Sequence, residues 1–179
     1  MRSRSTGGTS ASTRTIALVL AILVIGAIAI AGAAVSLDGG RSDTPSEDFS
    51  AGYRTITQTY QQRIEATKAL REKAKEPDDA AAKETYRAIL TATDDARDDY
   101  ADLDPPDADK DAFAAFVKLL DDQSAQLLGV VSAAEAGDRT AINSGLQEYG
   151  RALTQWILAR QTFDKKTGFS QSTGGSGAA

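Results

Sequence analysis

The pattern of hydrophobic and polar residues divides the chain near residue 37. Residues 15–37 form a run of 23 residues that has no charged side chain and only two hydroxyl side chains, Thr15 and Ser36. A helix needs about 20 predominantly apolar residues to cross the hydrocarbon core of a bilayer. The run therefore predicts a single-pass transmembrane helix, and no other run in the chain approaches its length.

After residue 44 the apolar residues recur at intervals of three and four, which is the spacing of one face of an α-helix. Four such stripes follow one another, each long enough for about seven or eight helical turns. The second alternates steps of four and three, as a coiled-coil seam does. In chain order the stripes are Phe49, Tyr53, Ile56, Tyr60, Ile64, Thr67, Leu70 and Ala74; Ala82, Tyr86, Ile89, Thr93, Ala96, Tyr100 and Leu103; Phe113, Phe116, Leu120, Gln123, Leu127, Val131 and Ala134; and Ile142, Leu146, Tyr149, Leu153, Trp156, Arg160 and Phe163.

Residues with preferences for helix ends separate the stripes. We expect Thr44 to cap the first helix, with Pro45 at its first position, and Pro77 to end it. Gly145 and Gly150 lie inside the fourth helix, and our hypothesis is that they permit close packing against a neighbour. The remaining boundaries are expected at Asp78 or Asp79, Pro105-Pro106, Asp107, Gly137, Asp138 and Gly168.

Helices of similar length joined by short connections pack as antiparallel neighbours. The sequence therefore predicts an all-α protein, in which a transmembrane helix at 15–37 precedes an up-down-up-down four-helix bundle at 45–167. Residues 38–44 would link the two. The polar ends at 1–14 and 168–179, which are rich in Gly and Ser, are expected to be disordered tails.

The charges that flank the apolar run predict its orientation. Arg2, Arg4 and Arg14 precede it without an acidic residue, whereas residues 38–179 carry a net charge of −8. Positively charged flanks stay in the cytoplasm, so we expect a cytoplasmic N-terminus and a bundle outside the plasma membrane. The alternative is a secretory signal cleaved within Ala31–Ser36. We favour the anchor because the apolar region of a signal peptide is usually only about 7–15 residues long.

The composition narrows the chemistry that the chain can perform. It contains no Cys and no His, so thiolate nucleophiles, Cys or His metal ligands and the commonest general base are absent. Neither a Ser-His-Asp triad nor a Glu-x-x-His di-iron site can be built. We therefore expect no enzymatic activity and no cofactor. The acidic outer part also argues against nucleic-acid binding, which requires clustered Lys and Arg.

The densest acidic cluster falls in the second helix, where like charges four residues apart repel. Such a cluster could bind a divalent cation weakly or face a basic partner. The alternative is a solvated face balanced by basic residues of the first helix, which we favour because charge runs are usually solvated. The acidic residues are Asp94, Asp95, Asp98, Asp99 and Asp102, and the basic residues are Arg63, Lys68, Arg71, Lys73 and Lys75.

Three further acids have the initial spacing of a calcium-binding loop. They are Asp107, Asp109 and Asp111, but the sixth and twelfth positions of the loop hold Ala112 and Lys118 instead of Gly and Glu. Acidic residues are also favoured at a helix N-terminus by the helix dipole. We interpret the three acids in this second way and predict no metal site.

Two long polar residues interrupt the apolar stripes, Gln123 in the third and Arg160 in the fourth. Gln123 could fix the register of the bundle or line a small ligand pocket between helices. Arg160 could pack its apolar stem and extend its guanidinium to solvent. The five Tyr residues and Trp156 are expected to be core aromatics with their polar ends at the edge of the bundle.

The segment Tyr100–Pro106, YADLDPP, followed by Phe113, Phe116, Gln123 and Leu127, resembles a broad group of small bacterial envelope proteins. These proteins have an N-terminal membrane segment or signal and an outer helical domain with a Leu-x-Pro-Pro turn between its second and third helices. The resemblance covers roughly residues 45–165 in pattern and implies a fold and a location, not an activity. Members often carry a His shortly after the prolines, and this chain has none.

Together these features lead us to expect a non-catalytic, membrane-anchored envelope protein. Its bundle would contact another protein or a second copy of itself, and the lipid bilayer would surround residues 15–37. The alternative is an extracytoplasmic ligand-binding or sensory domain that acts with a partner, because four-helix bundles have this role in bacterial receptors.

Overall fold

The computed structural model describes residues 45–169, and this part of the chain is all-helical, without strands. This confirms the all-α prediction for these residues. The predicted transmembrane helix at 15–37, the tail at 1–14 and the linker at 38–44 lie outside the described residues, as does the predicted tail from residue 170 onward. The segments are α2 (Glu47–Ala66), α3 (Lys68–Lys73), α4 (Ala80–Ala101), the 3₁₀-helix η1 (Asp107–Asp109), α5 (Lys110–Ala136) and α6 (Arg139–Thr167).

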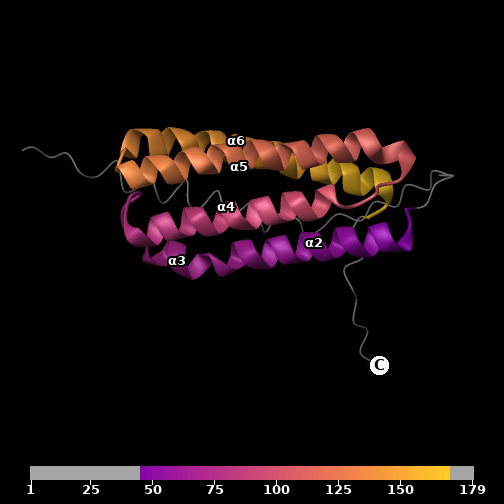
Figure 1. Ribbon diagram of the computed structural model, residues 1–179, viewed down its shortest axis with the longest axis horizontal. Coiled ribbons are helices and arrows are strands. Elements are labelled where there is room, and N and C mark those ends of the chain that lie inside the picture. The colour runs from indigo at the N-terminus through magenta and orange to yellow at the C-terminus, as the bar shows by residue number, and fades with distance from the viewer. Residues whose placement is uncertain (1–44, 170–179) are drawn as a thin grey trace, which may run out of the picture.

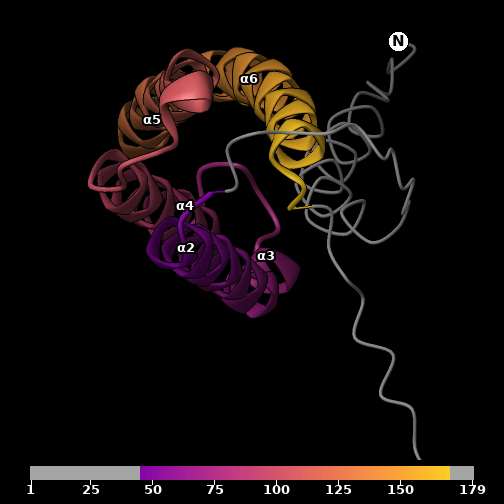
Figure 2. The same ribbon diagram turned by 90° about the vertical axis from the view of Figure 1, so that its right-hand side faces the viewer.

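Four helical rods lie side by side, formed by α2 with α3, by α4, by α5 and by α6 (Figure 1). Each rod runs in the opposite direction to the one before it. The end-on view places α4 between α2 and α5, and it places α3 beside α4 and apart from α6 (Figure 2). The start of α2, the end of α4, η1 and the end of α6 share one end of the bundle (Figure 1). We call it the η1 end. Within residues 45–169, no helix has the length and apolar character needed to span a bilayer.

Side-chain caps fix most of the helix boundaries. The backbone N–H of Phe49 donates to Ser46 Oγ at 3.1 Å, so the cap is Ser46 and not Thr44 as predicted, and Pro45 precedes the helix. Asp79 caps α4 through a 2.8 Å bond from the Ala82 N–H, and Asp138 similarly caps α6. Left-handed glycines end the last two helices as predicted, Gly137 at φ 72° and Gly168 at φ 76°.

The first rod is interrupted, although its apolar stripe predicted one continuous helix. Thr67 separates α2 from α3, and its Oγ1 donates to the Ile64 carbonyl at 2.7 Å. A hydroxyl that bonds a carbonyl in the preceding turn competes with the regular helical pattern and can bend a helix. The periodicity continues across the break because α3 keeps nearly the same direction as α2 (Figure 1).

The core consists of two clusters. At the η1 end, aromatic rings from all four rods pack with centroids 5.0–6.4 Å apart. They belong to Phe49, Tyr53, Tyr100, Phe113, Phe116, Phe163 and Phe169. The opposite end is built mainly from smaller residues, namely Ala82, Tyr86, Val130, Ala134, Ile142 and Leu146.

Close approach of α5 and α6 depends on one glycine. A Cβ atom at Gly145 would lie 2.7 Å from Val130 Cγ2, whereas a Cβ at Gly150 would meet nothing within 4 Å. The close-packing hypothesis therefore holds at Gly145 and is wrong at Gly150.

Candidate functional site

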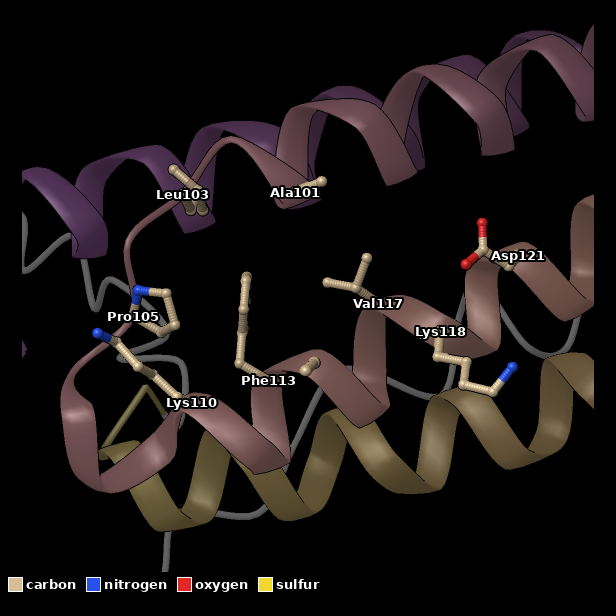
Figure 3. Close-up of a pocket in the computed structure, with 9 residues that line it drawn as sticks. Ala101, Leu103, Pro105, Lys110, Phe113, Val117, Lys118 and Asp121 are labelled. Atoms are coloured by element: carbon tan, nitrogen blue, oxygen red, sulfur yellow. The ribbon is translucent and has the colours of Figure 1, made fainter.

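A groove of about 440 Å³ lies on the outside of the bundle at the η1 end, between the end of α4 and the first half of α5 (Figure 3). Phe113 and Val117 project into it from α5 (Figure 3). Leu103 and Ala101 face them from the α4 side, and Pro105 closes one end. The remaining lining residues are Lys110, Ala114, Lys118 and Asp121.

The local sequence explains why the groove is there. Pro105-Pro106 prevents α4 from continuing, because proline lacks an N–H and the residue before it disfavours helical geometry. The chain therefore crosses to η1 in an extended path that holds Leu103 and Pro105 over α5. Leu103 is also seated against α2, since a Cβ at Gly52 would lie only 2.7 Å from its Cδ2.

The charges around the groove are largely paired. Lys110 Nζ lies 2.7 Å from Asp107 Oδ1, and this hydrogen bond raises the pKa of Lys110 and lowers that of Asp107. Lys118 Nζ lies 3.8 Å from Asp122 Oδ1. The two lysines therefore have carboxylate partners of their own.

A further apolar side chain is exposed on α5 beyond the groove. Leu128 is 58% exposed and follows Val117 by 11 residues, which is about three helical turns or 16 Å on nearly the same stripe. Leu158 on α6 is the other large hydrophobic residue exposed in the described part of the chain, also at 58%. The groove and Leu128 together form what we call the α4–α5 surface.

The acidic cluster of α4 is mostly neutralised. Arg97 lies within the run itself and reaches Asp94 at 3.0 Å and Asp98 at 2.8 Å, while Arg63 of α2 pairs with Asp95. Its hydrogen bond to Asp98 is the main reason why the pKa of Arg97 is raised. We favoured neutralisation of the cluster by basic residues of the first helix, and among its five acidic residues this applies to Asp95 alone. Asp99 and Asp102 form no ion pair within residues 45–169.

Two of the three acids with the spacing of a calcium-binding loop form ion pairs. Asp109 is buried, and its Oδ1 lies 3.0 Å from Lys166 Nζ, which ties η1 to the end of α6. Asp107 pairs with Lys110, as described above. Among the residues that the structure describes, no group of three or more carboxylates is arranged to hold a metal ion.

Gln123 and Arg160 are both buried. Gln123 Nε2 donates to the Leu119 carbonyl at 3.4 Å, and its Oε1 has no hydrogen-bond partner in the described part of the chain. Arg160 is only 3% exposed, so the prediction that its guanidinium reaches solvent is wrong. The guanidinium lies over the Trp156 ring at 5.7 Å, and its Nε is 3.5 Å from Asp164 Oδ2.

The tyrosine hydroxyls lie inside the bundle, which corrects the prediction that they reach its edge. Thr57 Oγ1 and Tyr100 Oη are 2.7 Å apart, and Tyr60 Oη is 3.4 Å from Thr93 Oγ1. Tyr86 Oη is buried without a hydrogen-bond partner among residues 45–169. Burial, reinforced by Asp79 and Asp78, raises the pKa of Tyr86 to about 12.

Arg71 is a buried charge that the sequence reasoning missed, because it assigned Arg71 to the solvated basic residues. Arg71 is 8% exposed, and its Nε and Nη1 atoms are buried without a hydrogen-bond partner in the described residues. The spacing of the stripe does indicate that Arg71 lies on the buried face, since Arg71 follows the stripe residue Thr67 by four positions and precedes Ala74 by three.

Comparisons with protein-family models, with curated proteins and with solved structures found no match.

Proposed function

We propose that this protein is a non-catalytic envelope protein whose residues 15–37 anchor it in the membrane and whose outer bundle binds an amphipathic helix of another envelope protein. The observation that carries the proposal is the α4–α5 surface. It combines an apolar groove on the outside of the bundle with an exposed leucine on the same stripe of α5. Grooves of this kind accept the apolar face of a helix through residues spaced along one side.

The geometry specifies the partner helix. One apolar side chain would enter the groove between Leu103 and Val117, and a second, about 11 residues away, would cover Leu128. Because the groove lysines are already paired, the unbalanced charges nearby are carboxylates, among them Asp102, which stands between the lining residues Ala101 and Leu103. The net charge of −8 over residues 38–179 adds to the negative potential at the groove. We therefore expect a partner helix with a basic flank.

The groove also has a suitable location for such a partner. Its lining residues belong to the end of α4, the connection to η1 and the first half of α5, at the η1 end of the bundle. Helix α2 also begins at this end (Figure 1). With residues 15–37 in the bilayer, an extended connection over residues 38–46 could hold this end at most about 30 Å from the membrane. The partner helix would then belong to the membrane-proximal part of a neighbouring protein.

Site-specific photocrosslinking in intact cells tests the proposal. A photoreactive amino acid is placed at Leu128, and a matched control is placed at Leu158, which is equally exposed but lies on α6. We expect crosslinks from Leu128 to one amphipathic, basic helical segment of one other protein, identified by mass spectrometry. We also expect Val117→Asp to abolish them. Equal crosslinking from Leu158, or crosslinks only to a second copy of this chain, would contradict the proposal.

A further inference from the structure

The end of the bundle opposite the groove contains a positive charge without a counter-charge. Arg71 on α3 is more than nine-tenths buried, yet no carboxylate of residues 45–169 pairs with it. A guanidinium cannot lose its proton in a protein, and a buried unpaired charge is strongly unfavourable. Arg160 differs in this respect, because it is also buried but has a carboxylate partner, with Asp164 Oδ2 at 3.5 Å from its Nε.

The charge of Arg71 also acts electrostatically on a buried tyrosine. Burial raises the pKa of Tyr149, the neighbouring Tyr60 hydroxyl adds to the rise, and the positive charge of Arg71 acts in the opposite direction. Tyr60 in turn lies 3.4 Å from Thr93 Oγ1. One fixed positive charge without a counter-charge is suited to an anion with a single negative charge.

The fold provides a way for an anion to reach Arg71. The α3 helix has six residues, begins after the break at Thr67 and lies beside α4 but apart from α6 (Figure 2). A short helix held on one side is the kind of segment that opens locally while the rest of a domain stays folded. Movement of α3 about Thr67 would expose the guanidinium without separating α4, α5 and α6.

We infer that Arg71 is the anchoring group of a binding site for a small monocarboxylate. A dianion such as sulfate fits less well, because it would leave one buried negative charge unbalanced. This site is separate from the α4–α5 surface and does not depend on the function proposed for that surface.

Thermal unfolding of the full chain in detergent micelles tests the inference. The wild type, Arg71→Met and Arg87→Met are compared in sodium acetate, sodium benzoate, sodium sulfate and sodium chloride at equal ionic strength. Arg87 is a matched control because it is exposed and pairs with Glu135. We expect acetate or benzoate at 100 mM to raise the Tm of the wild type and of Arg87→Met by about 3–5 °C over chloride. Arg71→Met should lose this rise. Sulfate, which stabilises folded proteins generally, should act equally on all three.

NMR spectroscopy of the wild-type protein provides a second measurement. In the wild type labelled with ¹⁵N-arginine, one buried Nε–H resonance should shift on addition of acetate and not on addition of chloride. The same carboxylate response in Arg71→Met as in the wild type, or no response of the wild type in either measurement, would overturn the inference.

Discussion

Tyr53 and Asp164 join the first and last helices of the bundle through a 2.6 Å hydrogen bond from the tyrosine hydroxyl to Asp164 Oδ1. The second carboxylate oxygen of Asp164 lies 3.5 Å from Arg160 Nε. A tyrosine, a carboxylate and a guanidinium thus form one buried network beside the aromatic cluster. Burial raises the pKa of Asp164, although the Tyr53 hydrogen bond and the Arg160 charge act in the opposite direction.

Removing the hydroxyl of Tyr53 should destabilise the bundle. We expect Tyr53→Phe to lower the free energy of unfolding by about 1.5–3 kcal/mol, the usual value for a hydrogen bond to a charged group. The matched control is Tyr86→Phe, which removes a buried hydroxyl that has no partner within residues 45–169 and should be neutral or stabilising. Urea unfolding followed by the fluorescence of Trp156, the single and buried tryptophan, measures both. Equal effects of the two substitutions would contradict the assignment.

The two glycines inside α6 should respond differently to alanine. Gly150→Ala enters open space and should stabilise the bundle by about 1 kcal/mol through helix propensity. Gly145→Ala should lose this gain, because its Cβ would lie 2.7 Å from the buried, β-branched Val130. Thermal unfolding of the two variants beside the wild type measures the difference. If Gly145→Ala is as stable as Gly150→Ala, α5 and α6 are not packed as closely as described.

The cap of α4 should make stability depend on pH. Asp79 is partly buried, which acts to raise its pKa, but N–H donors of Ala82, Lys75 and Glu76 outweigh this and lower the pKa below 3.8. The folded state therefore binds a proton less readily than the unfolded state. The resulting stability is present above pH 3.8 and is lost as the pH falls through the lowered pKa.

Asp79→Asn isolates this contribution, because asparagine can still cap the helix but does not titrate. We expect the wild type to exceed Asp79→Asn in free energy of unfolding at pH 6, and the difference to shrink at pH 3. Urea unfolding at the two pH values measures it. A difference that grows toward pH 3 would show that Asp79 has a raised pKa instead.

Arg97 should stabilise the acidic face of α4. Arg97→Met leaves Asp94 and Asp98 facing each other without their shared cation and should lower the free energy of unfolding by about 1 kcal/mol. Arg87→Met breaks a single exposed pair with Glu135 and should cost only a few tenths of a kcal/mol. Because salt screens exposed charges, the loss in Arg97→Met should diminish in 1 M NaCl. A loss that is unchanged by salt would indicate that packing of the Arg97 stem, and not its charge, is responsible.

The sequence predicted the core well because hydrophobic periodicity directly reports which face of a helix is buried. Tyr53, Ile89, Leu120 and Trp156 are buried as their stripes require. Gly137 and Gly168 end helices because glycine adopts the left-handed conformation without a steric penalty. These are local properties, so they can be derived without knowing the neighbouring helices.

The groove and the buried Arg71 depend on tertiary structure and were not predicted. The groove exists because the path through Pro105 holds Leu103 over Phe113, and this placement depends on how α2, α4 and α5 pack. Arg71 belongs to a run of charged residues, and burial is not expected there because charge runs are usually solvated. The prediction for Asp94 and Asp98 placed their cations on another helix, although Arg97 stands beside them in sequence.

Cysteine labelling in intact cells tests most directly whether the bundle is held outside the membrane. Because the chain has no cysteine, single reporters can be introduced at Ser3 and at Thr154, an exposed position on α6. We expect a membrane-impermeant maleimide to label Thr154→Cys in intact cells and to label Ser3→Cys only after permeabilisation. Labelling of Ser3→Cys but not Thr154→Cys in intact cells, or protection of both until permeabilisation, would contradict it.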